Sequence, residues 1–275
     1  MMPISALLLA LAAAVVHATW NLLLSGEEDT HSASAVALVF GTLVFAPVAV
    51  LTWRVDSGAV PYIAASSTLE LLYLALLATG YSVAAMSFIY PIARGSAPVL
   101  VLIAGVVAVG AAVSVLAAVG VIAVALGIVL VRGMSGSGRP RDLALALAVG
   151  ACIAGYTLVD KHGITHAGPI SYLEVVFGVT AIAYVLGVWR VRGGRALRGA
   201  VNRSTLLAGV GFFGAYALTL AALRLAPAAS VAAVRESSVV MATAFLAVSG
   251  RERIARERLA GAVAVVVGIA LISLG

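Results

Sequence analysis

VSVLAAVGVIAVALGIVLV, residues 113–131, indicates what kind of protein this is. Its nineteen residues include no acidic or basic side chain. A helix needs about 20 apolar residues to cross the roughly 30 Å hydrocarbon core of a bilayer. Inside lipid, the backbone polar groups must also be satisfied within the segment. We therefore predict that this stretch is a membrane-spanning helix.

Similar apolar stretches fill most of the chain. Sixty-three per cent of the 275 residues are hydrophobic, 10% are charged and the mean hydropathy is +1.15, which excludes a soluble globular domain. Long runs of Ala, Val and Leu replace the alternating polarity of a membrane barrel. We predict an all-α polytopic membrane protein with ten transmembrane helices. The other nine stretches are residues 4–24, 33–53, 67–89, 93–110, 143–160, 169–189, 206–225, 228–249 and 259–274.

Several other classes of protein are disfavoured by particular residues. The first stretch lacks a basic leader and a cleavage site, so we expect a retained helix rather than a signal peptide. Cys152 is the single cysteine, which leaves neither a disulfide framework nor a thiolate metal site. The net charge of +6 is concentrated in short loops, as is typical of membrane proteins rather than nucleic-acid binders. No Walker, His-Glu-x-x-His or Gly-x-Ser-x-Gly motif occurs, so we expect no enzyme, cofactor or metal.

An internal repeat divides the chain. Gly120-x-x-Ala123-x-x-x-Gly127 recurs 141 residues later, as do Arg94 and Ser96. A Gly/Ser-rich linker, residues 133–141, separates residues 1–132 from residues 142–275. We predict two repeats of five helices, and an odd number of helices requires the second repeat to be inverted. The later members of the matched pairs are Gly261, Ala264, Gly268, Arg235 and Ser237, and two further pairs are Tyr81 with Tyr216 and Trp20 with Tyr156, at offsets of 135 and 136.

The loop charges predict an orientation. Twelve arginines lie in the odd-numbered loops, whereas the even-numbered loops hold Arg54, Lys161 and Arg224. Because positive loops remain in the cytoplasm, this distribution predicts that both termini lie outside.

Three polar or aromatic residues of the first stretch share one helix face. His17, Trp20 and Asn21 are spaced i, i+3 and i+4. This spacing fits a cavity wall, with Trp20 as a stacking surface, but it also fits an interfacial tryptophan and a helix contact. His17 titrates near neutral pH and so provides a possible proton-coupling group.

Arg94 and Arg235 are the most informative residues of the sequence. Arg235 lies about 10 Å into its stretch at 1.5 Å per residue, where a charge is expensive and faces a cavity or a partner. Adjacent helical residues diverge, so we expect Glu174 to be a better partner for Arg235 than Glu236. Arg94 follows Pro91, which we interpret as a helix start or break, whereas Arg235 is expected within an intact helix.

Other intramembrane polar residues are weaker candidates. Tyr81 and Tyr216, as repeat mates, are expected on opposite walls of a cavity. Tyr156 shares a helix face with Asp160. Glu70 lies near the start of its stretch, where we expect it to face water.

The chain resembles EamA-type members of the drug/metabolite transporter superfamily along essentially its whole length. The resemblance is carried by residues 17–21, HATWN, residues 90–98, YPIARGSAP, and residues 234–238, VRESS. It implies ten helices in two inverted repeats and a central cavity lined by helices 1, 3, 4, 6, 8 and 9. It also implies cytoplasmic termini, opposite to the loop charges. The resemblance adds Tyr90 and Ser238 to the candidate substrate-binding residues, which are then His17, Trp20, Asn21, Tyr81, Tyr90, Arg94, Tyr156, Glu174, Tyr216, Arg235 and Ser238.

These observations predict a secondary active transporter of the cell inner (plasma) membrane. Two intramembrane arginines suggest a carboxylate-bearing substrate, such as an amino acid or an organic acid, which is exported or exchanged by alternating access. A proton or a counter-substrate is a possible coupling partner. The alternatives are a translocator of lipophilic or cationic toxic compounds or of a lipid-linked group, and a passive channel or accessory membrane subunit.

Overall fold

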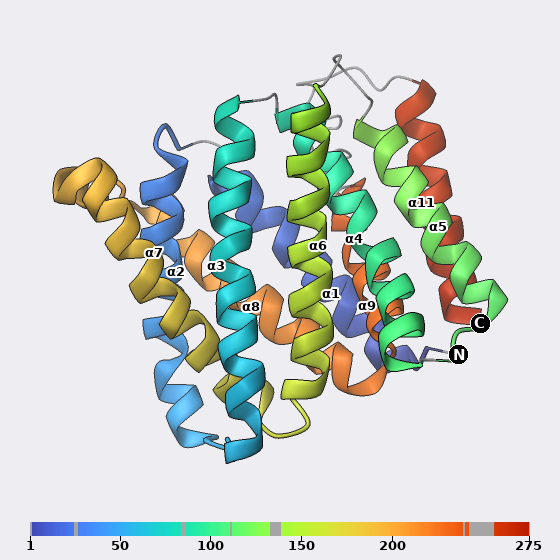
Figure 1. Cartoon of the computed structure of the whole chain (residues 1–275), viewed down its shortest axis with the longest axis horizontal. Coiled ribbons are helices and arrows are strands. Elements are labelled where there is room, and N and C mark those ends of the chain that lie inside the picture. Colours follow the sequence, from blue (N-terminus) through green and yellow to red (C-terminus); the bar gives the residue numbers. More distant parts are fainter. Residues whose placement is uncertain are drawn as a thin grey trace.

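Ten α-helices and one short 3-10 helix make up the described part of the chain in the computed structural model (Figure 1). The described residues are 2–24, 27–83, 86–110, 112–132, 139–238, 240–241 and 256–274. The elements are α1 (Ile4–Leu24), α2 (Thr30–Leu51), η1 (Ser57–Ala59), α3 (Val60–Val83), α4 (Met86–Val109), α5 (Val115–Arg132), α6 (Pro140–Gly163), α7 (Pro169–Gly199), α8 (Arg203–Leu225), α9 (Ala228–Arg235) and α11 (Arg256–Leu274).

The helices have the length and composition that a bilayer requires. Six spans among the described residues are long and apolar enough to cross a membrane, in α1, α2, α3, α6, α7 and α8. Three shorter apolar helical segments, Ile92–Val107, Val115–Leu130 and Ala260–Ile272, lie in α4, α5 and α11. The prediction of a helical multi-pass membrane protein is therefore confirmed, whereas the count of ten crossings stays a prediction.

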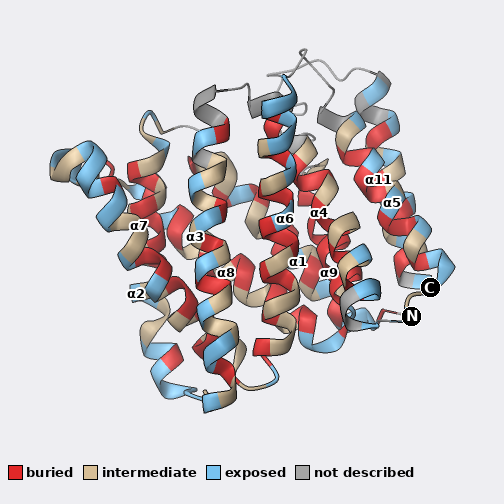
Figure 2. Cartoon of the chain, viewed as in Figure 1, coloured by how far each residue is buried: buried red, intermediate tan, exposed pale blue. Residues whose placement is uncertain are grey.

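Burial distinguishes inner from outer helices. All eight residues of α9 are buried, whereas the end of α7 is exposed (Figure 2). Large apolar side chains such as Leu43 and Ile182 are about two-thirds exposed, at 65% and 66%. In a membrane protein, such surfaces face lipid rather than water.

Small residues bring α5 and α11 together. A Cβ atom added to Gly120 would lie 2.6 Å from the carbonyl oxygen of Gly268. One added to Gly127 would lie 2.7 Å from the carbonyl oxygen of Gly261. Only glycine permits these backbones to approach so closely. The predicted role of these glycines as packing seams is confirmed.

Helices of the two halves interleave in the rest of the bundle. α1 packs against α8 and α9, α3 packs against α6 and α7, and α4 packs against α6 and α9. Both termini lie at the same end of the bundle (Figure 1). This interleaving brings polar residues from distant parts of the sequence to one place in the middle.

The prediction of a helix start or break beside Arg94 is wrong, and the helix end lies at Arg235 instead. α4 is continuous through Pro91 and Arg94, because a membrane helix tolerates proline where its surroundings satisfy the freed backbone group. α9 instead ends at Arg235, where the N–H of Glu236 donates to the carbonyl oxygens of Ala232 and Ala233, at 3.3 and 3.2 Å. Arg235 thus lies at a tightened helix end and not within an intact helix.

Candidate functional site

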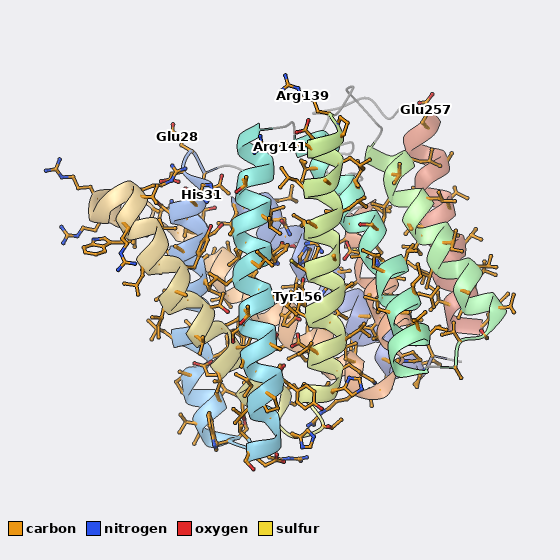
Figure 3. The ribbon with its side chains drawn as sticks, in the orientation of Figure 1. Glu28, His31, Arg139, Arg141, Tyr156 and Glu257 are labelled. Atoms are coloured by element: carbon orange, nitrogen blue, oxygen red, sulfur yellow. The ribbon has the colours of Figure 1, made fainter. Side chains whose placement is uncertain are left out.

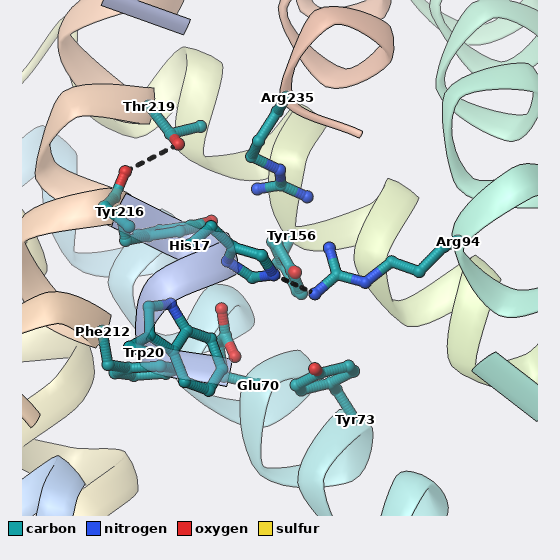
Figure 4. A pocket seen from close by; sticks show the side chains of 11 residues that line it. His17, Trp20, Glu70, Tyr73, Arg94, Tyr156, Phe212, Tyr216, Thr219 and Arg235 are labelled. Atoms are coloured by element: carbon teal, nitrogen blue, oxygen red, sulfur yellow. Dashed lines mark hydrogen bonds between the residues drawn. The ribbon is translucent and has the colours of Figure 1, made fainter. Parts of the chain in front are cut away.

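A narrow cavity lies between helices of both halves, in the middle of the bundle. Its volume of about 30 Å³ leaves room for one or two water molecules. Tyr156 lies in this central region, about 22 Å along α6 from Arg141 at the bundle end (Figure 3). α1, α3, α4, α6, α8 and α9 contribute the lining residues His17, Trp20, Glu70, Tyr73, Arg94, Tyr156, Phe212, Ala215, Tyr216, Thr219 and Arg235 (Figure 4).

Two arginines converge on one carboxylate oxygen beside this cavity. Nη1 of Arg94 lies 3.0 Å from Oε1 of Glu236, and Nη2 of Arg235 lies 3.4 Å from the same oxygen. The three side chains are at most 5% exposed. Buried charges are costly unless they are paired, so the shared oxygen stabilises both guanidinium groups. Two positive charges and one negative charge leave this trio with one net positive charge.

His17 fixes the second edge of the Arg94 guanidinium. Nε2 of His17 lies 2.6 Å from Nη2 of Arg94 (Figure 4). Because a guanidinium group only donates hydrogen bonds, Nε2 of His17 must accept, which makes this imidazole neutral. Arg94 is therefore held from both α1 and the end of α9.

Aromatic rings cover the next part of the wall. Trp20 contacts His17 edge-on, with ring centroids 4.8 Å apart, and Phe212 edge-on at 5.0 Å. Phe212 stacks in turn on Phe177 at 4.9 Å. Edge-to-face and stacked contacts of this kind fix ring orientation. The result is a rigid apolar surface next to the arginines.

Several polar atoms at the site are unsatisfied. Among the described residues, Nε1 of Trp20, Nε of Arg235 and Oε2 of Glu236 are buried without a hydrogen-bond partner. Each such atom costs about 1–3 kcal/mol, so water or a polar ligand is the natural partner. Two of the three are donors, which favours a ligand with acceptor oxygens.

A second buried carboxylate positions one wall of the cavity. Asp160 of α6 is fully buried and accepts hydrogen bonds from the hydroxyl groups of Tyr172, at 2.8 Å, and Tyr216. Tyr216 therefore joins the cavity with its ring fixed by α6. α6 thus supplies Tyr156, which lines the cavity, and Asp160, which holds Tyr216 in place.

The second half of the chain matches a known protein family. Residues 142–274, nearly all of the second predicted repeat, match the model of the EamA-like transporter family. By this match, the second half of the chain belongs to the EamA-like transporter family. EamA-type proteins are membrane transporters of the drug/metabolite type rather than enzymes, as the sequence motifs lead one to expect.

A structural comparison covers both halves of the chain. A crystal structure of a protein superposes on it with a TM-score of 0.76 and 17% sequence identity, covering 98% of each chain. At this identity, the likeness concerns the fold alone. No curated protein matches the chain. The fold of the whole chain therefore has a solved counterpart, while the family match rests on the second half.

The structure brings six of the eleven predicted binding residues to the cavity. They come from α1, α4, α6, α8 and α9, all of which are helices that the resemblance implied. Asn21 is not among them, because its amide donates to the carbonyl oxygen of His17, 2.8 Å away on its own helix. The six are His17, Trp20, Arg94, Tyr156, Tyr216 and Arg235.

Four other predicted residues are not among the described lining residues of the cavity. Tyr81 of α3 and Tyr90 of α4 have side chains outside the described part of the structure. Ser238 is buried just beyond the end of α9, and its hydroxyl has no partner among the described residues. Glu174 of α7 is absent from the cavity lining, and its Oε2 is likewise without a described partner.

The predicted ion pair between Arg235 and Glu174 is wrong. Arg235 contacts Glu236 instead. The rule that adjacent side chains diverge applies to a continuous helix, whereas α9 ends between these two residues. The turn at Glu236 allows both side chains to reach the same side.

Four cavity residues escaped the sequence prediction altogether, and Glu70 was misassigned. Tyr73, Phe212, Ala215 and Thr219 line the cavity without any sequence signal beyond their types. Glu70 is 3% exposed and lines the cavity, so the expectation that it faces water is wrong. A carboxylate inside an apolar stretch is itself the signal that identifies it.

Proposed function

We propose that this protein is a secondary active transporter, an exporter or exchanger, of a small carboxylate-bearing metabolite such as an amino acid or an organic acid. The observation that carries the proposal is the convergence of Arg94 and Arg235 on Oε1 of Glu236 beside the central cavity. Equivalent residues of the two predicted repeats thus supply the two cations.

Glu236 marks the place that a substrate carboxylate would take. A carboxylate between two guanidinium groups makes charge-assisted hydrogen bonds, which are the strong ones. The trio has one net positive charge, and Nε of Arg235 lacks a described partner. A substrate carboxylate entering here gains contacts that Glu236 alone leaves unused.

The rest of the wall fits a zwitterion. Glu70 supplies a carboxylate on α3 that would attract an ammonium group, and His17 and Tyr156 supply neutral hydrogen-bonding groups. The ring of Trp20 offers an apolar face for the remainder of the molecule. An amino acid therefore meets a complementary group at each of its ends.

Transport requires the cavity to open. A volume of about 30 Å³ is too small for an amino acid or an organic acid, so the helices must separate before a substrate enters. Since α4 and α9 contact each other through Arg94 and Glu236, replacement of Glu236 by a substrate carboxylate would loosen that contact. Alternating access then consists of rocking one repeat against the other.

The α5–α11 interface supports two inverted repeats. Gly120 and Gly261 are repeat mates, as are Gly127 and Gly268, yet Gly120 contacts Gly268 and Gly127 contacts Gly261. An exchange of this kind is what a two-fold axis between antiparallel helices produces. We propose the boundaries 1–132 and 142–275 for the repeats and the plasma (inner) membrane for the location.

Flux measurements in proteoliposomes test the function. Vesicles preloaded with unlabelled amino acids or organic acids should accumulate the labelled compound by counterflow. Replacing Arg235 by Met should reduce this counterflow to the level of empty vesicles, while the control Arg141→Gln at the bundle end should leave it intact. Saturation and counterflow distinguish a carrier from a passive channel, and a wild-type protein without either would refute the proposal.

Translocation of a lipophilic cation is the main alternative. A cation entering the cavity would meet Glu70 on one wall, but the net positive charge of Arg94, Arg235 and Glu236 together would repel it. Uptake of a labelled lipophilic cation, with no response to carboxylates in the same vesicles, would favour this alternative.

A further inference from the structure

The end of α7 leaves the line of its own helix. Gly193 has φ +80° and ψ 166°, a conformation that favours glycine, and it interrupts the helical backbone. The segment that follows, residues 194–199, turns away at the edge of the bundle, where α7 is drawn in gold (Figure 1). Trp189, just before the kink, is 53% exposed. An exposed tryptophan beside a kinked helix end is typical of the membrane interface.

An apolar groove opens beneath this bent end. It has a volume of about 380 Å³ and lies between α2, the end of α7 and the start of α8. Arg198 is the one charged residue of its wall. The other lining residues are apolar: Ala35, Val36, Val39, Phe40, Leu43, Val185, Leu197, Val201 and Leu206.

Arginines lie close in sequence to the groove residues Leu197, Arg198 and Val201. Residues 186–207 include five arginines and no acidic residue. Arg192 pairs with Asp29 at 3.1 Å, but within the described residues Arg195, Arg198 and Arg203 have no ion-pair partner, and all three are exposed. A cluster of basic residues next to a membrane helix attracts anionic lipid headgroups.

We propose that this groove binds an anionic phospholipid of the surrounding membrane. One acyl chain fills the apolar groove between Val39 and Leu197, and Arg198, which lines the groove and is exposed, binds the phosphate with help from Arg195. The fork of donors on a guanidinium group suits phosphate oxygens. The charge of the groove mouth and the apolar wall below it together select an anionic lipid over a neutral one.

Lipid retention measured by native mass spectrometry tests the headgroup. The purified full chain is mixed with equal amounts of phosphatidylglycerol and phosphatidylcholine of the same acyl chains. We expect preferential retention of phosphatidylglycerol, at least tenfold weaker in Arg195→Gln/Arg198→Gln. The control Arg139→Gln/Arg141→Gln removes two exposed arginines from the same end of the bundle and should retain the lipid as the wild type does. Equal retention of both lipids by the wild type, or equal losses in both double variants, would overturn the proposal.

A second variant tests the acyl chain. Val39→Trp fills the groove and should weaken retention of phosphatidylglycerol without changing any charge, whereas Val267→Trp, on the exposed face of α11, should not. Inorganic phosphate at millimolar concentration should not displace the lipid, because phosphate gains nothing from the groove. Undiminished retention in Val39→Trp, or complete displacement by phosphate, would contradict a lipid site.

Discussion

α4 and α9 carry the two equivalent arginines of the chain, but they hold them in different ways. α4 runs without a break from Met86 to Val109, and Gly95 follows Arg94. α9 ends at Arg235, and the equivalent position, 141 residues after Gly95, is Glu236. The single carboxylate that pairs with both arginines thus comes from the second half alone.

This difference suggests a division of labour between the repeats. Arg94 is held by Glu236 at 3.0 Å and by His17 at 2.6 Å. Arg235 has a longer contact of 3.4 Å with Glu236 and a buried Nε without a described partner. The two repeats each supply one arginine, but only the second repeat has a glutamate after it, where the first has Gly95. Arg94 is therefore firmly held, and Arg235 is more available to bind a substrate.

Removing Arg94 and Arg235 one at a time should reveal the largest difference between the two repeats. Arg94→Met leaves Glu236 and His17 without their main donor and should lower the free energy of unfolding by about 3–5 kcal/mol, as for a broken buried pair. Arg235→Met should cost less stability and still abolish transport. Thermal unfolding in detergent, together with counterflow, measures both effects. Equal losses of stability in the two variants would show that the arginines are held alike.

Glu236→Gln should sharpen the comparison, because it removes the negative charge and keeps the shape. If Glu236 occupies the place of the substrate carboxylate, its loss should strengthen substrate binding while the empty protein becomes less stable. A hydrogen bond to a charged group is worth about 1.5–3 kcal/mol, so we expect roughly 10- to 150-fold tighter binding. Isothermal titration and the melting temperature, each with and without substrate, give the two numbers. Weaker binding would mean that Glu236 itself contacts the substrate.

Two glycines at helix contacts, Gly127 and Gly95, differ in how closely they approach the neighbouring backbone. A Cβ atom at Gly127 would lie 2.7 Å from a backbone oxygen of α11, and one at Gly95 would lie 3.1 Å from the carbonyl oxygen of Ala125. Overpacking of this kind costs about 1–3 kcal/mol, so Gly127→Ala should be the more destabilising of the two. Chemical denaturation of the purified chain compares them.

The matched control for these glycines is Gly178→Ala in α7. A Cβ atom there meets nothing within 4 Å. Alanine in an open helix position stabilises by about 0.5–1 kcal/mol relative to glycine. If Gly178→Ala destabilises the fold as much as Gly127→Ala, close packing is not the cause.

The sequence predicted the parts of this molecule that follow local rules. Membrane helices follow from apolar length, and Arg94 and Arg235 are conspicuous because charges inside apolar stretches are costly. The position of the helix end did not follow, because Pro91 looks like a break and Arg235 does not, yet the surrounding helices decide otherwise. Tyr73 and Phe212 could not be singled out either, since only the packing of α3 and α8 against α1 and α6 distinguishes them from other membrane aromatics.

The smallest expected effect concerns the starts of α2 and α7, which are the second helices of the two predicted repeats. Asp29 caps α2 by accepting from the backbone N–H and the hydroxyl of Ser32, at 3.2 and 2.6 Å, whereas Gly168, the N-cap residue of α7, provides no side-chain cap. Partial burial opposes ionisation, but the bonds from Ser32 and the charge of Arg192 outweigh it, and the pKa of Asp29 is lowered. A carboxylate with a lowered folded pKa contributes stability above its unfolded pKa and loses it as the pH falls through the folded value.

Asp29→Ala should therefore cost about 1 kcal/mol at neutral pH, the usual value of an N-cap, and progressively less below about pH 4. Melting temperatures of the two proteins between pH 7 and pH 3 would converge if this holds, and a constant difference would assign the effect to packing rather than to the charge.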